Sequence, residues 1–278
     1  MPTALLFDQH VLPHTKGYDP FIYTDILAAY SGETNQTMFH FWEMENQVIL
    51  GMQDTRVPFL QEGVASIQKA GYHVVVRNSG GLAVVANPGV LNFSIILPQE
   101  AEVKGLSINN GYDYMKDIIE SALNDFDATI EAFEVHDSYC PGDYDLSING
   151  KKFAGIAQRR IKKGIGIMIY LSVHGNQDER GHVVRDFYQV GLKEAFGTGA
   201  FPPVNPDSMA NLNDLLGADL TITDMKQRLI TAVKERFTLS EDAQKDFDTY
   251  LTRPDFEEEY NRQYQRMAVR NDVINKEE

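Results

Sequence analysis

Cysteine is nearly absent from this sequence, which has one among 278 residues, at position 140. A single thiol can form no disulfide within its own chain, and it excludes metal sites that need two or more cysteine ligands. We expect no metal among the site residues. Any chemistry at Cys140 must come from one sulfur atom.

Positive charge is scarce as well, since 25 lysines and arginines face 40 aspartates and glutamates, a formal net charge of −15. Such an acidic surface repels phosphate backbones, so we expect no nucleic-acid partner. The sequence has no run of about 18 apolar residues, and its start lacks the basic stretch of a secretory signal. A cytoplasmic protein with no membrane partner is expected.

Repeats, low-complexity tracts and Gly/Ser linkers are also missing, so no sharp boundary precedes residue 200. The apolar content of 43% is enough for a sizeable core. We predict a catalytic domain over residues 1–200 and a helical extension over residues 201–278, packed on the same body. The Pro-rich stretch 197–208 is the candidate joint.

Three segments have the periodicity of helices: residues 18–33, 112–126 and 224–237. For the first, the expected signals are a cap at Asp19, Pro20 in the first turn and a stop at Gly32. The charged end, residues 254–278, should fray or form a solvated helix.

Strand-like runs outnumber helices. They lie at residues 37–42, 47–52, 72–98 (two or three strands), 129–136, 145–160 and 164–175. Asn149-Gly150 divides one of them, as in a two-residue hairpin. Hairpins without strict strand–helix alternation predict an α+β fold, α/β in some schemes, with a mixed, largely antiparallel sheet flanked by helices.

The one cysteine lies in a segment, SYCPGDY, that proline and glycine keep out of regular structure, so we expect its thiol on a loop. A thiol becomes a useful nucleophile when a nearby cation favours the thiolate. Lys152 lies just beyond the predicted hairpin turn, so its amine can fold back toward Cys140, while Lys151 points to the other face. The alternatives are a core cysteine and a solvated lysine.

His136 is a third titratable group near Cys140 and could act as a general base, as in cysteine hydrolases. No protease-like signature surrounds the cysteine. An ordinary polar residue at a strand end is the alternative for His136.

A glycine pair interrupts the segment VRNSGGLAVV, residues 76–85. The segment matches neither of the common phosphate-loop patterns, but Gly80 and Gly81 let a ligand come close to the backbone N–H groups. Arg77 could meet a carboxylate, a phosphate or an acidic protein group. A glycine-rich hairpin with a solvated arginine is the alternative.

VRNSGGLAVV, GVLNFS and INGKKFAGIAQRR together resemble the core motifs of the lipoate protein ligase and octanoyltransferase superfamily, which is related in fold to the biotin protein ligases. The resemblance covers roughly residues 35–200. SYCPGDYDLSINGKKFAG is the sharpest piece, and it is similar to the branch that transfers octanoyl groups from the glycine cleavage H protein. The resemblance implies an acyl thioester on Cys140, an essential Lys152, and substrate-binding residues Arg77, Ser79, Gly80, Gly81, Asn92 and Gly155.

The resemblance also implies the reaction. An octanoyl or lipoyl chain would pass from a lysine of the H protein to Cys140, and then to a lysine on a lipoyl domain of a 2-oxoacid dehydrogenase. One amide replaces another, so no ATP or other cofactor is expected. Lys152 is the candidate for moving the proton, with Gly155 or the Gly80-Gly81 loop as candidate oxyanion donors.

Departures from the ligase pattern RRxSGGGAVxHD bear on nucleotide use. The first arginine, the third glycine, the histidine and the aspartate are replaced by Val76, Leu82, Ala86 and Asn87. These losses argue against ATP. Two other interpretations stay open: an ATP-dependent lipoate ligase in which Cys140 is incidental, and a non-catalytic acyl-protein binder.

Two further expectations follow from the implied substrates. An eight-carbon chain needs an apolar slot, for which Val84, Val85 and Phe93 are candidate walls; the alternative for each, which we favour for any single one, is sheet core. The basic run Arg159–Lys163 is a candidate docking surface for acidic lipoyl-bearing domains, or an ordinary solvated face.

Overall fold

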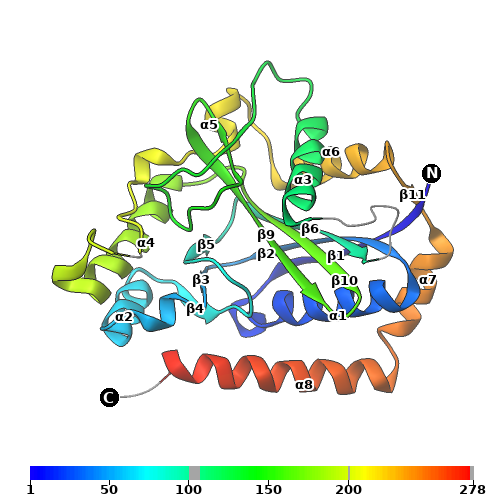
Figure 1. Cartoon of the computed structure of the whole chain (residues 1–278), viewed down its shortest axis with the longest axis horizontal. Coiled ribbons are helices and arrows are strands. Elements are labelled where there is room, and N and C mark those ends of the chain that lie inside the picture. Colours follow the sequence, from blue (N-terminus) through cyan, green and yellow to red (C-terminus); the bar gives the residue numbers. More distant parts are fainter. Residues whose placement is uncertain (100–106, 200, 276–278) are drawn as a thin grey trace.

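Two β-sheets organise the chain in this computed structural model, which describes residues 1–99, 107–199 and 201–275 (Figure 1). The large sheet has the order β11-β1-β2-β6-β10-β9-β8-β7, and the small one has the order β4-β3-β5. The strands of the large sheet are β1 (Thr3–Leu12), β2 (Thr37–Met44), β6 (Val90–Pro98), β7 (Glu131–Ala132), β8 (Asp145–Ile148), β9 (Lys151–Ile161), β10 (Gly164–Ser172) and β11 (Thr238–Leu239). Those of the small sheet are β3 (Gln47–Leu50), β4 (His73–Val76) and β5 (Val84–Ala86).

Antiparallel pairing dominates the large sheet from β2 through β7. Only β1 pairs in parallel, with β2 on one side and β11 on the other. The parallel step from β1 to β2 needs a crossover, and the first helix supplies it. The predicted α+β class, with a mixed and largely antiparallel sheet, is confirmed.

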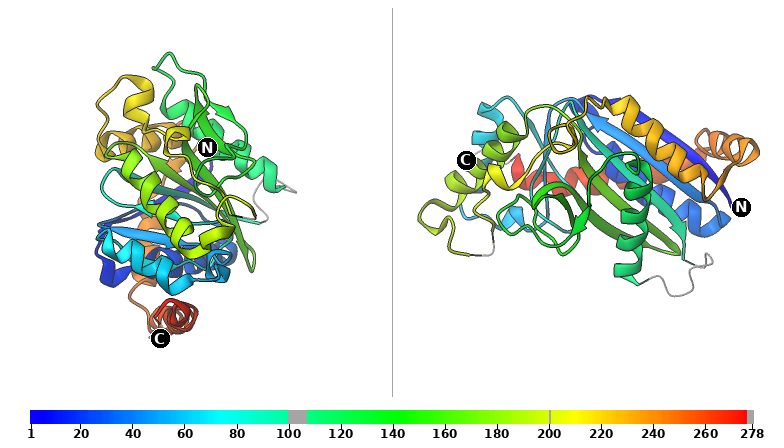
Figure 2. Two further views of the ribbon diagram at one scale, coloured as in Figure 1. Left: turned by 90° about the vertical axis from the view of Figure 1, so that its left-hand side faces the viewer. Right: turned by 90° about the horizontal axis from the view of Figure 1, so that it is seen from above.

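Helices cover both faces of the large sheet and one side of the small one (Figures 1 and 2). One face packs against α1 (Asp19–Thr34), with α8 (Pro254–Asn271) outside α1 and α7 (Glu241–Tyr250) against β1. The other face packs against α3 (Ile108–Ala122), which contacts α6 (Ile222–Lys234). The small sheet contacts α2 (Leu60–Lys69) and α4 (Gln177–Leu192), and a short α5 (Leu212–Leu216) follows.

The side chains of β6 alternate between the two faces of the large sheet, and this explains why a core lies on each face. Phe93 and Ile95 are fully buried in the core beneath α3 and α6, whereas Ile96 lies in the core beneath α1. Successive side chains of a strand point to opposite faces, so a strand buried on both sides must be apolar at nearly every position. β6 is therefore the central partition of the fold.

The first helix forms as predicted, but its end signals differ. Tyr18 is the cap, without a side-chain hydrogen bond, and Asp19 lies inside the helix and accepts a hydrogen bond from the Tyr260 hydroxyl. The predicted stop at Gly32 is wrong. A Cβ at Gly32 would lie 2.5 Å from the carbonyl carbon of Lys163, so glycine serves close packing there, and the helix ends at Asn35, whose φ is 58°.

The predicted strands form, with two changes and one turn as predicted. Residues 72–98 form β4, β5 and β6, but β3 lies between β4 and β5, so these two are not hairpin partners. The strand expected over residues 129–136 shrinks to the two residues of β7. The Asn149-Gly150 turn joins β8 to β9 with positive φ at both residues, as predicted.

The C-terminal residues pack on the body of the protein. Helix α8 buries Phe256 and Met267, and the Asn271 side chain pairs with both backbone groups of Val76, at 2.7 Å to the N–H and 3.1 Å to the carbonyl. Residues 254–271 are thus a docked helix, not a fraying one, and residues 276–278 lie outside the described range. The division at residue 200 stays a prediction.

Candidate active site

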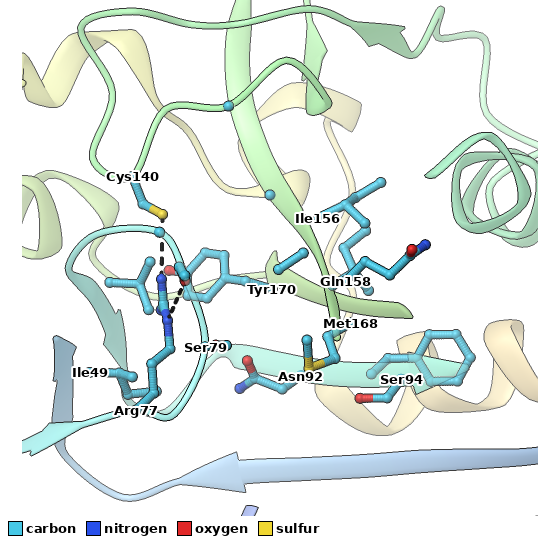
Figure 3. Close-up of a pocket in the computed structure, with 18 of the residues that line it drawn as sticks. Ile49, Arg77, Ser79, Asn92, Ser94, Cys140, Ile156, Gln158, Met168 and Tyr170 are labelled. Carbon is cyan, nitrogen blue, oxygen red and sulfur yellow. Dashed lines mark hydrogen bonds between the residues drawn. The ribbon is translucent and has the colours of Figure 1, made fainter. Parts of the chain in front are cut away.

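One cavity of about 340 Å³ gathers every residue that the resemblance singled out (Figure 3). Its lining includes Cys140, Lys152, Arg77, Ser79, Gly80, Gly81, Asn92 and Gly155. These residues come from the small sheet's glycine loop, from β6, from the loop before β8, and from β9. Segments far apart in the chain therefore meet at a single place.

Strand register explains why there is room for a ligand. Tyr170 of β10 lies between Asn92 of β6 and Gly155 of β9, and Met168 lies between Ser94 and Ala157 in the next row. Gly155 and Ala157 have almost no side chain, which leaves a hollow over this part of the sheet. Phe21 and Thr24 of α1, Trp42 of β2 and the glycine loop line the cavity around it.

Cys140 sits at one end of the cavity on a half-buried loop with a left-handed φ of 47°. Its Sγ accepts a hydrogen bond from the Leu82 backbone N–H at 3.1 Å, and a guanidinium nitrogen of Arg77 lies 3.7 Å away. A left-handed residue other than glycine costs energy, so the surrounding contacts must hold it in place. They aim the sulfur at the glycine loop.

Lys152 is buried beneath the cysteine loop, with 5% of its side chain exposed. Its ammonium lies 2.9 Å from Asp145 Oδ1 and donates to the carbonyl oxygens of Tyr139 at 2.9 Å and Cys140 at 2.8 Å. It also reaches the Ser138 hydroxyl at 3.2 Å. These four acceptors share the three protons of the ammonium, so Lys152 holds the backbone of Cys140 while Arg77 faces its sulfur.

Burial raises the pKa of Asp145, and the neighbouring Lys152 ammonium opposes that shift. The backbone N–H groups of Val135 and Gly142 donate to the other carboxylate oxygen, both at 3.2 Å. Asp145 therefore ties together both ends of the segment that carries the cysteine. Sequence reasoning missed it; the only signal was an acid in the strand that pairs with the lysine-bearing strand.

Arg77 reaches across the glycine loop. Its Nε donates to the Gly80 carbonyl at 3.0 Å and its Nη2 to the Leu82 carbonyl at 2.9 Å. Gly81 has φ of 89°, and a Cβ there would lie 2.4 Å from Arg77 Nη2 and 3.0 Å from Cys140 Sγ. Glycine at position 81 is thus what lets the arginine and the sulfur approach each other.

The other candidate residues divide. Val84 and Phe93 line the cavity, whereas Val85 lies in the core beside it. His136 is 79% exposed, lies 3.2 Å from Glu134 and does not line the cavity. Arg159 of the basic run is drawn inward, with its Nε 2.5 Å from Asp25 and its Nη1 donating to the Asn78 carbonyl at 2.7 Å.

A buried polar network behind Cys140 gave no sequence signal. The Tyr139 and Tyr170 hydroxyls lie 2.5 Å apart, and Gln177 links Tyr139 to Ser172. Arg180 is fully buried and donates to oxygens of Asn87, Pro88, Ser172, His174, Gln177 and Asn211. Burial raises the pKa of both tyrosines, so they remain hydrogen-bond donors.

Two buried amide nitrogens on the cavity wall, Asn92 Nδ2 and Gln158 Nε2, have no hydrogen-bond partner in the described part of the chain. Unpaired buried donors are costly and are often satisfied by a ligand. Within residues 1–99, 107–199 and 201–275, no group of three or more histidine, cysteine or acidic side chains is placed to hold a metal ion. The described helices include none long and apolar enough to cross a bilayer.

Residues 16–234 match the lipoyl protein ligase A/B catalytic domain, and the chain belongs to this family. Among its relatives is the octanoyl-[GcvH]:protein N-octanoyltransferase of Bacillus velezensis, 42% identical over 84% of this chain and 82% of its own. Another is the lipoyl-[GcvH]:protein N-lipoyltransferase of Listeria monocytogenes, 48% identical over 69% of each chain. The resemblance drawn from the motifs is confirmed.

Solved structures agree on the fold. A lipoate-protein ligase A bound with ATP aligns with a TM-score of 0.64 at 18% identity, covering 90% of this chain and 94% of that one. A lipoate protein ligase of Thermoplasma acidophilum with bound lipoic acid aligns at 0.62 and 18%, covering 90% and 95%. The predicted ligase-like fold is confirmed.

Proposed function

We propose that this chain is an ATP-independent acyltransferase that takes an octanoyl or lipoyl group from the lysine of the glycine cleavage H protein and passes it to lipoyl domains of 2-oxoacid dehydrogenases. One observation carries the proposal. The sulfur of Cys140 lies at the end of a largely apolar cavity, where the Arg77 guanidinium and the Leu82 backbone N–H both face it. The names of the Bacillus and Listeria relatives support the donor.

The cavity suits an acyl chain. Figure 3 shows Cys140 at one end and Met168, Ile156 and Ser94 toward the other, so a chain bound to the sulfur can lie along the hollow over β10. Burying most of eight carbons contributes about 5 kcal/mol, at roughly 0.8 kcal/mol for each methylene. This energy holds the donor's acyl chain while its amide is attacked.

In the first step the Cys140 thiolate attacks the carbonyl carbon of the donor amide. The carbon–nitrogen bond breaks, and the donor lysine leaves as an amine after taking up one proton from water, a proton that is released again in the second step. The Arg77 guanidinium and the Leu82 N–H stabilise the anionic sulfur before attack. The product is an acyl thioester on Cys140.

In the second step an acceptor lysine attacks the thioester carbonyl, loses a proton and regenerates the thiolate. An amide is made at the end and an amide was broken at the start, so no nucleotide is required. Two replacements support this: Ala86 stands where ligases have a histidine, and Asn87, in place of their aspartate, bonds to Arg180 and Tyr72.

Lys152 and Asp145 position the nucleophile. The ammonium binds the carbonyl of Cys140 and that of the residue before it, which fixes the left-handed turn. The ion pair is almost completely buried, so water has little access to it. Holding the Cys140 sulfur in the correct position for attack raises the rate of the first step.

The test is a transfer assay with octanoylated H protein and an unmodified lipoyl domain, without ATP. We expect acylated lipoyl domain with the wild-type chain and none with Cys140→Ala. Acylation that requires free lipoate and ATP, and that survives Cys140→Ala, would instead identify a ligase. Binding of the donor with no transfer under either condition would identify a non-catalytic binder.

A further inference from the structure

A second hollow lies on the far side of the glycine loop, between the chain after β3 and the last turns of α8. Its volume is about 640 Å³. Met52 and Val269 line it although 46% and 70% of their surfaces are exposed, and Val273 lies beside them. Clustered apolar side chains on an exposed surface commonly mark a contact site for another protein.

The charge of this hollow is opposite to that of the molecule. Arg266 and Arg270 line it, and within the described residues neither has a carboxylate at ion-pair distance. Burial and the nearby Arg159 guanidinium lower the pKa of Arg270, and the Asp25 carboxylate opposes that shift. The hollow therefore presents two guanidinium groups on a chain of net charge −15.

The hollow is connected to the nucleophile by short contacts. Gly51, just before Met52, approaches the loop so closely that a Cβ there would lie 1.8 Å from the Gly81 carbonyl oxygen. On the other side of Gly81, a Cβ would lie 3.0 Å from Cys140 Sγ. The α8 wall is fixed to the same loop, because Asn271 bonds to the backbone of Val76. Figure 1 shows this end of α8 beside β3 and β4.

We propose that this apolar hollow with its two arginines docks the acyl-donor protein, by a surface on which acidic side chains surround an apolar contact. The inference rests on the proposed function and specifies where its protein substrate binds. An acidic partner is repelled by most of this molecule, so a positive, partly apolar surface next to the catalytic loop is where attraction and access to Cys140 coincide. The contact orients the partner so that its acylated lysine reaches the cavity.

The experiment measures the dissociation constant of octanoylated H protein for the Cys140→Ser chain, which binds without turnover. At low ionic strength we expect Arg266→Glu to raise the dissociation constant about tenfold, and the effect should shrink as salt is added. Val269→Asp, a change at the apolar wall, should weaken binding as well. Circular dichroism and thermal unfolding check that each variant is folded.

Lys245→Glu is the matched control, because Lys245 is 73% exposed on α7 and its reversal changes the net charge equally. An Arg266→Glu chain that binds the H protein as tightly as the Lys245→Glu chain overturns the inference. The inference is also overturned if the Arg266→Glu chain loses binding to a DNA duplex or to anionic vesicles while it still binds the H protein as the wild-type chain does. Since binding is read without chemistry, failure of the transfer assay is a separate result.

Discussion

Gly81 decides how closely the sulfur and its cation can approach. A methyl group at this position would strike Arg77 Nη2 and press on Cys140 Sγ, and φ there is already in the glycine region. A methyl group on the neighbouring Gly80 would point into open space, with nothing within 4 Å of it. The two glycines of one loop therefore have different roles.

Gly81→Ala should reduce transfer by about 100-fold, because misplacing reacting groups by roughly 1 Å costs a factor of that order. Gly80→Ala, the control, should keep activity within a few-fold. Initial rates of ATP-free transfer, with unfolding curves for both variants, are the measurement. Equal losses in the two variants would show that the loop's flexibility, and not this contact, matters.

Asp54 is fully buried beside the same loop and accepts hydrogen bonds from Gly51 N–H and the Tyr188 hydroxyl, both at 2.7 Å. Burial raises the pKa of Asp54 from 3.8 to about 6. The folded state thus holds the proton more tightly than the unfolded state. Stability contributed by this group is present at low pH and is lost as the pH rises toward and through 6.

Relative to Asp54→Asn, which does not titrate, the wild-type chain should lose on the order of 1 kcal/mol of unfolding free energy between pH 5 and pH 8. Urea unfolding of both chains at several pH values measures this difference. A gap between the two that does not vary with pH would mean that Asp54 is not protonated more readily in the folded protein.

Single residues were only partly predictable from the sequence. Cys140 could be placed on a loop because proline and glycine flank it, and Lys152 could be placed near it because a hairpin returns the chain. The identity of the sulfur's cation was not readable, since it depends on which side chain Asp145 captures. Arg180 was equally unreadable, because its partners come from three separate segments, at residues 87–88, 172–174 and 211.

At the scale of elements, the ion pair between β9 and the start of β8 holds the cysteine loop. Lys152→Met would leave the Asp145 carboxylate buried without a counter-charge, with 2% of its side chain exposed. Removing one partner of a buried pair costs about 3–5 kcal/mol, whereas replacing both costs much less.

We therefore expect the free energy of unfolding of Lys152→Met to be lower than that of the wild-type chain. The double variant Lys152→Met/Asp145→Asn should recover at least half of this loss. Chemical unfolding of the three chains tests this. Transfer should stay impaired in the double variant, because the carbonyl oxygens of the cysteine turn remain without their donor. A double variant no more stable than the single one would show that the pair's charges are not coupled.

Elements were predicted best where their signal was local. The apolar face of α3 and the Asn149-Gly150 turn follow from spacing and from backbone preference alone. The predicted helix end at Gly32 was wrong because this glycine packs against the carbonyl group of Lys163, more than a hundred residues away in the sequence. The order β4-β3-β5 was also beyond reach, since the parallel pairing of β3 with β4 depends on the intervening helix α2.

At the scale of the whole molecule, charge and function are linked. A chain of net charge −15 that exchanges acyl groups between proteins must meet its partners at restricted places. In the basic run, Arg159 is paired with Asp25, and the docking role of the run stays a prediction. The fold and family were predictable from motifs, while the docking surface required knowing that α8 returns to the glycine loop.

The most direct test of the central claim is the mass of the chain after brief mixing with octanoylated H protein, without ATP or acceptor, and quenching in acid. The wild-type chain should gain one octanoyl group on the peptide that contains Cys140, removable by hydroxylamine, and Cys140→Ala should gain none. A wild-type chain that never carries the acyl group, while the acceptor still becomes acylated when it is added, would contradict the account.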